Sequence, residues 1–150
     1  MNGLHILARR AVLERLKSHP AVLALVPASS IYGQTTPPDP AWPFINLGPT
    51  NTVRRSAACL WGGDVTMLVS AFAKARRSGA GSTIETAEDH AGRIGAAIES
   101  ALARYGTAAV FDGAPARVRC SLGDMRLAID GAEMDAFHYS ATVTVRVSAE

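Results

Sequence analysis

The stretch FHYSATVTVRVS, residues 137–148, decides the fold because its side chains alternate without a fault. Apolar residues occupy every second position, and histidine, hydroxyl and arginine side chains occupy the positions between them. Such a period of two is typical of an antiparallel β-strand with one face buried and the other in water. The inward set comprises Phe137, Tyr139, Ala141, Val143, Val145 and Val147.

Further strands precede this one along the chain. Residues 65–73 are largely apolar on both faces, which favours a central strand. Residues 44–47 predict a short strand. We interpret residues 50–58, TNTVRRSAA, as a connection or a weak continuation of it. Between residues 117 and 129 the alternation changes phase at Gly123-Asp124, which is what a β-bulge produces.

Two longer segments carry the period of a helix. Residues 4–17 place leucine, alanine and valine at i and i+4, and His19-Pro20 ends that helix. Residues 21–26 are then a short helical turn or an apolar plug. A second helix is expected from Ser82, where Ser82 and Glu85 match a capping box. Gly92 and Gly95 lie inside it, and a close approach to the sheet would explain both.

The expected order is therefore α-β-β-α-β-β, in a single α+β domain over residues 1–150. We predict a four-stranded, mainly antiparallel sheet with both main helices packed on one face. Residues 27–43, which contain five prolines, and residues 105–116 are expected to be loops.

The charge balance argues against a dedicated nucleic-acid binder. Fifteen Lys and Arg against thirteen Asp and Glu leave a net charge of only +2, whereas nucleic-acid affinity depends on many neutralised phosphates. The total conceals an uneven distribution, because residues 1–77 are basic and residues 78–150 are acidic. This split suits a protein that meets copies of itself or a differently charged neighbour. Charges scattered over a solvated surface are the simpler interpretation.

No stretch of the sequence predicts catalysis or a cofactor. The sequence lacks the HExxH, GxSxG, CxxC and P-loop patterns. The segment SGAGST, residues 78–83, is interpreted as a flexible loop rather than a phosphate-binding turn. His90 is expected at the surface. Cys59 and Cys120 are expected to be buried reduced thiols rather than metal ligands. No segment has the roughly 20 apolar residues that a membrane span needs.

Five residues are candidates for contacts in an assembly. Arg54-Arg55 and Arg76-Arg77 flank the predicted central strand, and arginine is enriched at protein interfaces. Solubility is the alternative role for either pair. Trp61 precedes Gly62-Gly63 and is either a core residue at the start of a strand or an exposed anchor.

As a whole, the sequence resembles the tail-completion or tail-terminator proteins of long-tailed phages and gene transfer agents. The resemblance rests on the opening helix AVLERLKSHPAVLALV, the segment SSIYGQTTPPDPAWPFINLG, the strand VTMLVSAFAKARR and the helix ETAEDHAGRIGAAIESAL, followed by a closing hairpin. In that family an "IY" and a proline-rich run follow an apolar helix. The VRRSAACLWGG segment has no counterpart among the family's motifs, and residues 105–116 are longer than expected.

The resemblance implies a structural virion protein with no catalysis, cofactor or metal. It implies a ring of identical copies, typically a hexamer, that caps the tail tube, stops its polymerisation and joins the tail to the head. The expected partners are further copies, the tail-tube protein and a head–tail connector or neck protein, with DNA only passing through the lumen and no membrane. The expected location is the virion tail, after assembly in the cytoplasm of the bacterial host. A neck protein on the head side, a small nucleic-acid-binding module and an enzyme of unrecognised type remain alternatives.

Overall fold

The computed structural model describes residues 3–57, 60–133 and 135–150. Its helices are α1 (Leu4–Ser18), α2 (Pro20–Leu23) and α3 (Ala87–Leu102), with a 3-10 turn, η1 (Ala28–Ser30), between α2 and the first strand. Its strands are β1 (Ile31–Tyr32), β2 (Phe44–Leu47), β3 (Asn51–Ala57), β4 (Leu60–Lys74), β5 (Arg76–Arg77), β6 (Thr83–Glu85), β7 (Gly106–Phe111), β8 (Ala114–Ile129) and β9 (Ala136–Ala149).

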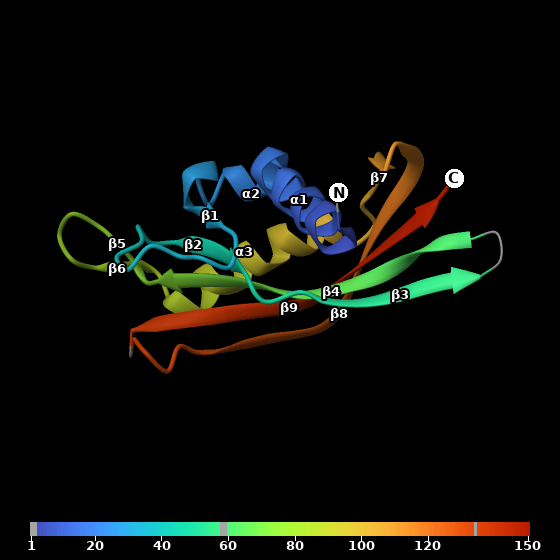
Figure 1. Ribbon diagram of the computed structural model, residues 1–150. Helices are drawn as coiled ribbons and strands as arrows, with labels where there is room; N and C mark the ends of the chain where they lie inside the picture. Colours follow the sequence, from blue (N-terminus) through green and yellow to red (C-terminus); the bar gives the residue numbers. More distant parts are fainter. Residues whose placement is uncertain (1–2, 58–59, 134) are drawn as a thin grey trace.

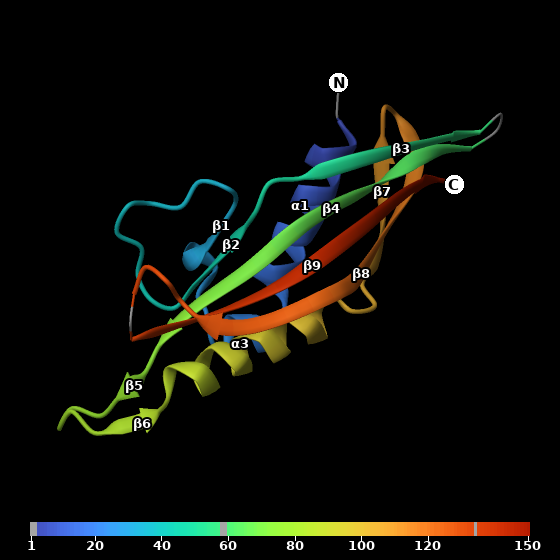
Figure 2. The same cartoon turned by 90° about the horizontal axis from the view of Figure 1, so that it is seen from below.

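Within the described residues, seven strands form one long, curved sheet (Figures 1 and 2). The order is β1-β2-β4-β9-β8-β7, and β3 pairs with the part of β4 that β2 leaves free. All pairs are antiparallel except β1 with β2. The α+β class and the antiparallel character are as predicted, but the prediction of four strands is wrong. β5 and β6 form a separate two-stranded ribbon.

Two strands of the large sheet, β1 and β7, were missed. For residues 50–58 the second interpretation is confirmed, because β3 continues β2 along the same side of β4. Residues of β3 are exposed on both faces from Asn51 to Ser56, so the segment lacks the alternation that marks a half-buried strand. β7 alternates, but it falls inside the predicted loop over residues 105–116 and uses small residues. β1 is two residues long.

The helices cover one face of the sheet, as predicted (Figure 1). α1 buries Leu4, Ala8, Ala11, Val12 and Leu16, the i and i+4 positions that the sequence indicated. The inward residues of β4 and β9 lie opposite them. β4 runs through the middle of the sheet between β9 on one side and β2 and β3 on the other, which confirms its central position.

The start of α3 differs from the prediction. The capping box at Ser82 is wrong, because Thr83 to Glu85 are extended in β6 and the helix begins at Ala87. Thr86 is the N-cap, and its hydroxyl accepts a hydrogen bond from the Asp89 N–H at 3.2 Å. Ser82 and Thr86 are both residue types that cap helices. Because β6 pairs with β5, residues 83–85 are extended, and the helix begins only after Thr86.

The two glycines of α3 have different surroundings. A Cβ at Gly95 would lie 2.5 Å from the ring of Tyr139 on β9, so α3 can approach the sheet there only because this residue has no side chain. A Cβ at Gly92 would lie 3.7 Å from Leu127, an ordinary van der Waals contact. The predicted close approach is therefore confirmed at Gly95 and wrong at Gly92.

Other local predictions are confirmed by the structure. The register of β8 against β9 shifts between Leu122 and Met125, which is the predicted bulge. Cys120 is a buried free thiol, and burial raises its pKa to about 11. Cys59 lies outside the described residues.

Candidate assembly surfaces

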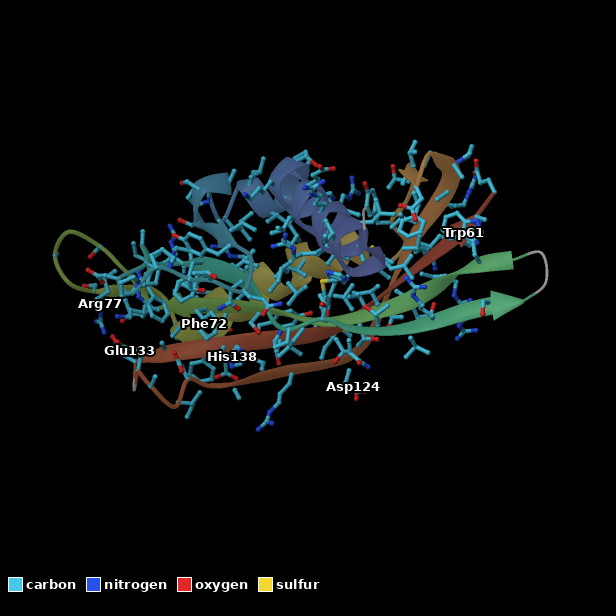
Figure 3. The ribbon with its side chains drawn as sticks, in the orientation of Figure 1. Trp61, Phe72, Arg77, Asp124, Glu133 and His138 are labelled. Atoms are coloured by element: carbon cyan, nitrogen blue, oxygen red, sulfur yellow. The ribbon has the colours of Figure 1, made fainter. Side chains whose placement is uncertain are left out.

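Three of the candidate residues, Arg54 and Arg55 of β3 and Trp61 of β4, lie together at one end of the sheet. They line a hollow of about 350 Å³, which we call the Trp61 hollow. The Trp61 ring packs against Phe111 of β7 with ring centroids 4.7 Å apart, and both rings line this hollow. Figure 3 shows Trp61 at this end of the sheet. Trp61 is thus half-buried, and both of its predicted roles are compatible with its position. The lining consists of Leu4, Arg54, Arg55, Ser56, Trp61, Gly62, Phe111, Asp112 and Ala114.

The two arginines of this end have different electrostatic surroundings. Arg55 lies 2.6 Å from Asp64, whose other oxygen atom accepts a hydrogen bond from Arg146 on β9 at 2.9 Å. The Arg146 hydrogen bond, more than the attraction to Arg55, holds the pKa of Asp64 below its usual value, although partial burial opposes the shift. Arg54 forms no ion pair within the described residues. Its charge is therefore free to meet a neighbour.

Arg76 and Arg77 lie at the opposite end of the sheet. They form β5, which projects with β6 beyond the end of β4 (Figures 1 and 2). Arg76 lies 3.6 Å from Glu85, and Arg77 donates to the carbonyl oxygen of Gly81 at 3.4 Å. The structure therefore separates the two predicted arginine pairs, and each pair marks a different end of the molecule.

Glu85 of β6 connects this projecting ribbon to α3 through hydrogen bonds. It accepts two hydrogen bonds from Arg93, at 2.9 and 2.8 Å, and these bonds are the main reason that its pKa is lowered. The side chain of Ile84 beside it is 61% exposed. The sequence pattern did not indicate this exposed isoleucine, because residues from Ser82 onward were expected to be helical.

His90 was expected at the surface, and this expectation is wrong. Its side chain is buried, and its Nδ1 donates to the carbonyl oxygen of Lys74 at 2.8 Å. The bond attaches the first turns of α3 to the end of β4. His90 therefore has a structural role, because its hydrogen bond to Lys74 holds α3 in place on the sheet.

The face of the sheet away from the helices carries an aromatic stack near the ribbon end. Phe72 of β4 stacks on Phe44 of β2, with centroids 4.8 Å apart, and on His138 of β9, at 4.7 Å (Figure 3). Trp42 packs edge-on against Phe44 at 5.0 Å, and Lys74 lies over the Trp42 ring at 4.6 Å. This stack holds the proline-rich loop against the sheet.

Two classes of site are absent from the described parts of the chain. No three His, Cys, Asp or Glu side chains among the described residues are grouped to hold a metal ion. None of the helices there is long and apolar enough to cross a membrane.

The fold defines a class of protein, a small mixed α/β domain, with the Trp61 hollow at one end of its sheet and the β5–β6 ribbon at the other. The family described as Tail completion protein gp17 matches residues 10–148. The chain therefore belongs to this family of tail completion proteins, which are structural components of phage tails.

A solved structure gives a second comparison. A chain in the structure titled "Virion of native gene transfer agent (GTA) particle" has the same fold, with a TM-score of 0.65 and 17% sequence identity over 94% of both chains. No curated protein matches the sequence.

Proposed function

We propose that this protein is a tail terminator, a ring of identical copies that caps the tail tube. The observation that carries the proposal is the family match over residues 10–148. The fold shared with a chain of the gene transfer agent virion, over 94% of both chains, supports a place in a virion.

The distribution of contact features supports a subunit with several neighbours. A terminator must bind its own copies, the last ring of the tube and the head side, so it needs three distinct surfaces. The Trp61 hollow and the β5–β6 ribbon lie at opposite ends of the sheet, and the sheet edges lie between them (Figure 2). Copies that repeat one heterologous contact close into a ring when the rotation between them divides a full turn.

In this proposal the ring is hexameric and stops tube growth by covering the tube's last open surface. Its opposite rim then binds the head–tail connector or neck protein, and DNA passes only through the lumen. Assembly takes place in the cytoplasm of the bacterial host, and the finished protein belongs to the virion tail. None of these steps requires catalysis or a cofactor.

Incubation with purified tail tubes tests the proposal. Tubes should stop growing in the presence of tube protein when the wild-type chain is added, and electron microscopy should show a ring at one end of each tube. Continued growth would contradict the capping role. Binding to isolated heads and not to tubes would instead favour a neck protein on the head side.

Reversing charge on the ribbon tests which end meets the tube. The double variant Arg76→Glu/Arg77→Glu should weaken capping, because the ribbon would then present negative charge. Glu85 keeps its two hydrogen bonds from Arg93 in this variant, so α3 stays attached. The matched control is Arg10→Glu/Lys17→Glu on exposed positions of α1, with the same change in charge. Equal capping by both variants would exclude a role for the ribbon.

A further inference from the structure

A hollow of about 310 Å³ lies at the base of the β5–β6 ribbon, and we call it the ribbon-base hollow. Figure 2 shows the ribbon leaving the sheet at the start of α3. The hollow is formed by residues just after α2, the end of the proline-rich loop, the junction of β4 with β5, and α3. Its lining combines three apolar residues with three basic ones: Leu25, Trp42, Pro43, Lys74, Arg76 and His90. Among the described residues, no carboxylate side chain lines it.

His90 is the buried side chain of this hollow, with only 6% of the residue exposed. The carbonyl oxygen of Lys74 can only accept, so the Nδ1 atom 2.8 Å away carries the proton of the neutral ring. Nε2 has no hydrogen-bond partner within the described residues. It is not sealed from solvent, because the sealed, unpartnered side-chain atoms there belong to His19 and His138. Since His90 lines the hollow, Nε2 is the ring nitrogen that a ligand there can reach.

The two cations of the hollow have hydrogen-bond donors to spare. Arg76 lies 3.6 Å from Glu85, and Lys74 lies 3.7 Å from Glu133, and both separations exceed hydrogen-bonding distance. Arg93 supplies two hydrogen bonds to Glu85, at 2.9 and 2.8 Å. The nearby carboxylates therefore offset charge, but the donors of Lys74 and Arg76 have no acceptor in the described part of the chain.

The indole ring of Trp42 keeps Lys74 beside the hollow. The Nζ atom of Lys74 lies 4.6 Å from the ring centroid, which is a cation–π distance. Trp42 is itself held by its edge-on contact with Phe44, at 5.0 Å between centroids. The ammonium group is thus positioned before a ligand arrives, which reduces the entropy cost of binding.

We propose that the ribbon-base hollow binds a tetrahedral oxyanion of the phosphate type, held by His90, Arg76 and Lys74. The three side chains come from three elements, and each can donate to a different oxygen atom. A phosphate group has three or more acceptor oxygens, whereas a carboxylate has two, so phosphate matches the donor set better. The bound anion connects α3 to the first residue of β5, and it thereby fixes the base of the ribbon.

Hydrogen bonding through His90 makes the binding depend on pH. Nε2 must gain a proton before it can donate to an acceptor-only anion such as sulfate. The charged groups around the ring come from β4, β5, β6 and α3: Lys74, Arg76, Glu85, Glu88, Asp89 and Arg93. Carboxylates, lysine and arginine keep their charges between pH 6 and pH 8. Sulfate should therefore bind at least about threefold more tightly at pH 6 than at pH 8.

An NMR titration of the wild-type chain with sodium sulfate tests the site. The backbone amides of Arg76 and His90 should shift until they saturate, and sodium chloride at the same ionic strength should not produce these shifts. Arg76→Ala should weaken binding at least about tenfold, because one charged hydrogen bond is lost. Arg77→Ala is the matched control, because it removes the same charge from the next residue, which does not line the hollow.

His90→Asn separates the roles of the two ring nitrogens. The asparagine amide can donate to the Lys74 carbonyl oxygen as Nδ1 does, but it offers nothing in the place of Nε2. The variant should bind sulfate equally at pH 6 and pH 8, unlike the wild type. Should it fail to fold, Arg76→Ala and Arg77→Ala still decide the proposal, because both of those residues are exposed.

Inorganic phosphate and phenyl phosphate distinguish two sources of the anion. Tighter binding of phenyl phosphate would assign the apolar part of the hollow to the organic group of a phosphate ester, and equal affinity would assign the site to free phosphate. Shifts no larger than those with chloride, equal binding by Arg76→Ala and Arg77→Ala, or wild-type sulfate binding that is independent of pH would overturn the proposal. Tube capping does not depend on this site, so each function can fail alone.

Discussion

The contact between Gly95 and Tyr139 gives the sharpest test of how α3 is seated on the sheet. Gly95→Ala and Gly92→Ala make the same chemical change three positions apart on one helix. Both remove a glycine from a helix interior, which alone should stabilise the chain by about 0.5–1 kcal/mol. They differ in what the new methyl group meets.

The methyl group of Gly95→Ala would lie between 2.5 and 2.8 Å from three ring atoms of Tyr139. That ring is buried, and its hydroxyl donates to Glu99 at 3.2 Å, so it cannot rotate away freely. Overpacking of this kind costs about 1–3 kcal/mol. The methyl group of Gly92→Ala meets Leu127 at 3.7 Å and needs no displacement.

The helix-propensity gain is common to both variants, so their difference isolates the clash. We expect Gly92→Ala to raise the free energy of unfolding by about 0.5–1 kcal/mol. Gly95→Ala should be less stable than Gly92→Ala by about 1–3 kcal/mol. Equilibrium unfolding in urea, followed by far-UV circular dichroism, measures both at equal protein concentration. Equal stabilisation by the two substitutions would refute the close approach of α3 to β9.

Three further predictions concern single side chains. The pKa of Asp64 is lowered in the folded chain, chiefly by the hydrogen bond from Arg146, so its stabilising effect is present above its unfolded pKa near 3.8 and is lost as the pH falls through the folded value. The wild type should therefore lose more stability than Asp64→Asn between pH 7 and pH 2.5 in urea titrations, and parallel losses would contradict this. The Cys120 thiol, with a pKa of about 11, should resist alkylation at pH 8 until the chain unfolds, once the other cysteine is replaced by serine. Its rapid labelling in the native chain, followed by mass spectrometry, would show an accessible thiol instead. Trp61→Ala removes the ring packed on Phe111 and should cost about 1–3 kcal/mol, below the range for a fully buried tryptophan, because Trp61 is half-buried. A wild-type melting curve for that variant would mean that the ring contributes nothing to the fold.

The sequence predicted the elements that bury a continuous apolar face. α1, β4 and β9 show clear periods because their inward residues have almost no exposure in the structure. β3 gave no such signal, since a strand at an open edge has water on both faces. The number of strands was therefore underestimated at the edges of the sheet, where burial no longer constrains the residue types.

The candidate site was predicted in part. Arg54, Arg55 and Trp61 come together because β3 and β4 form a hairpin, and adjacency in the chain was already a signal for it. The exposure of Met125 on β8 was not predicted, because alternation shows which face a side chain occupies and not whether a helix covers that face. The charge difference between residues 1–77 and residues 78–150 was visible in the sequence.

Tail-tube growth in the presence of the purified wild-type chain tests the central claim most directly. Tube length, measured by electron microscopy while tube protein is still being added, should stop increasing, and each arrested tube should carry one ring at its end. Tubes that lengthen at the same rate with and without the protein would contradict the account.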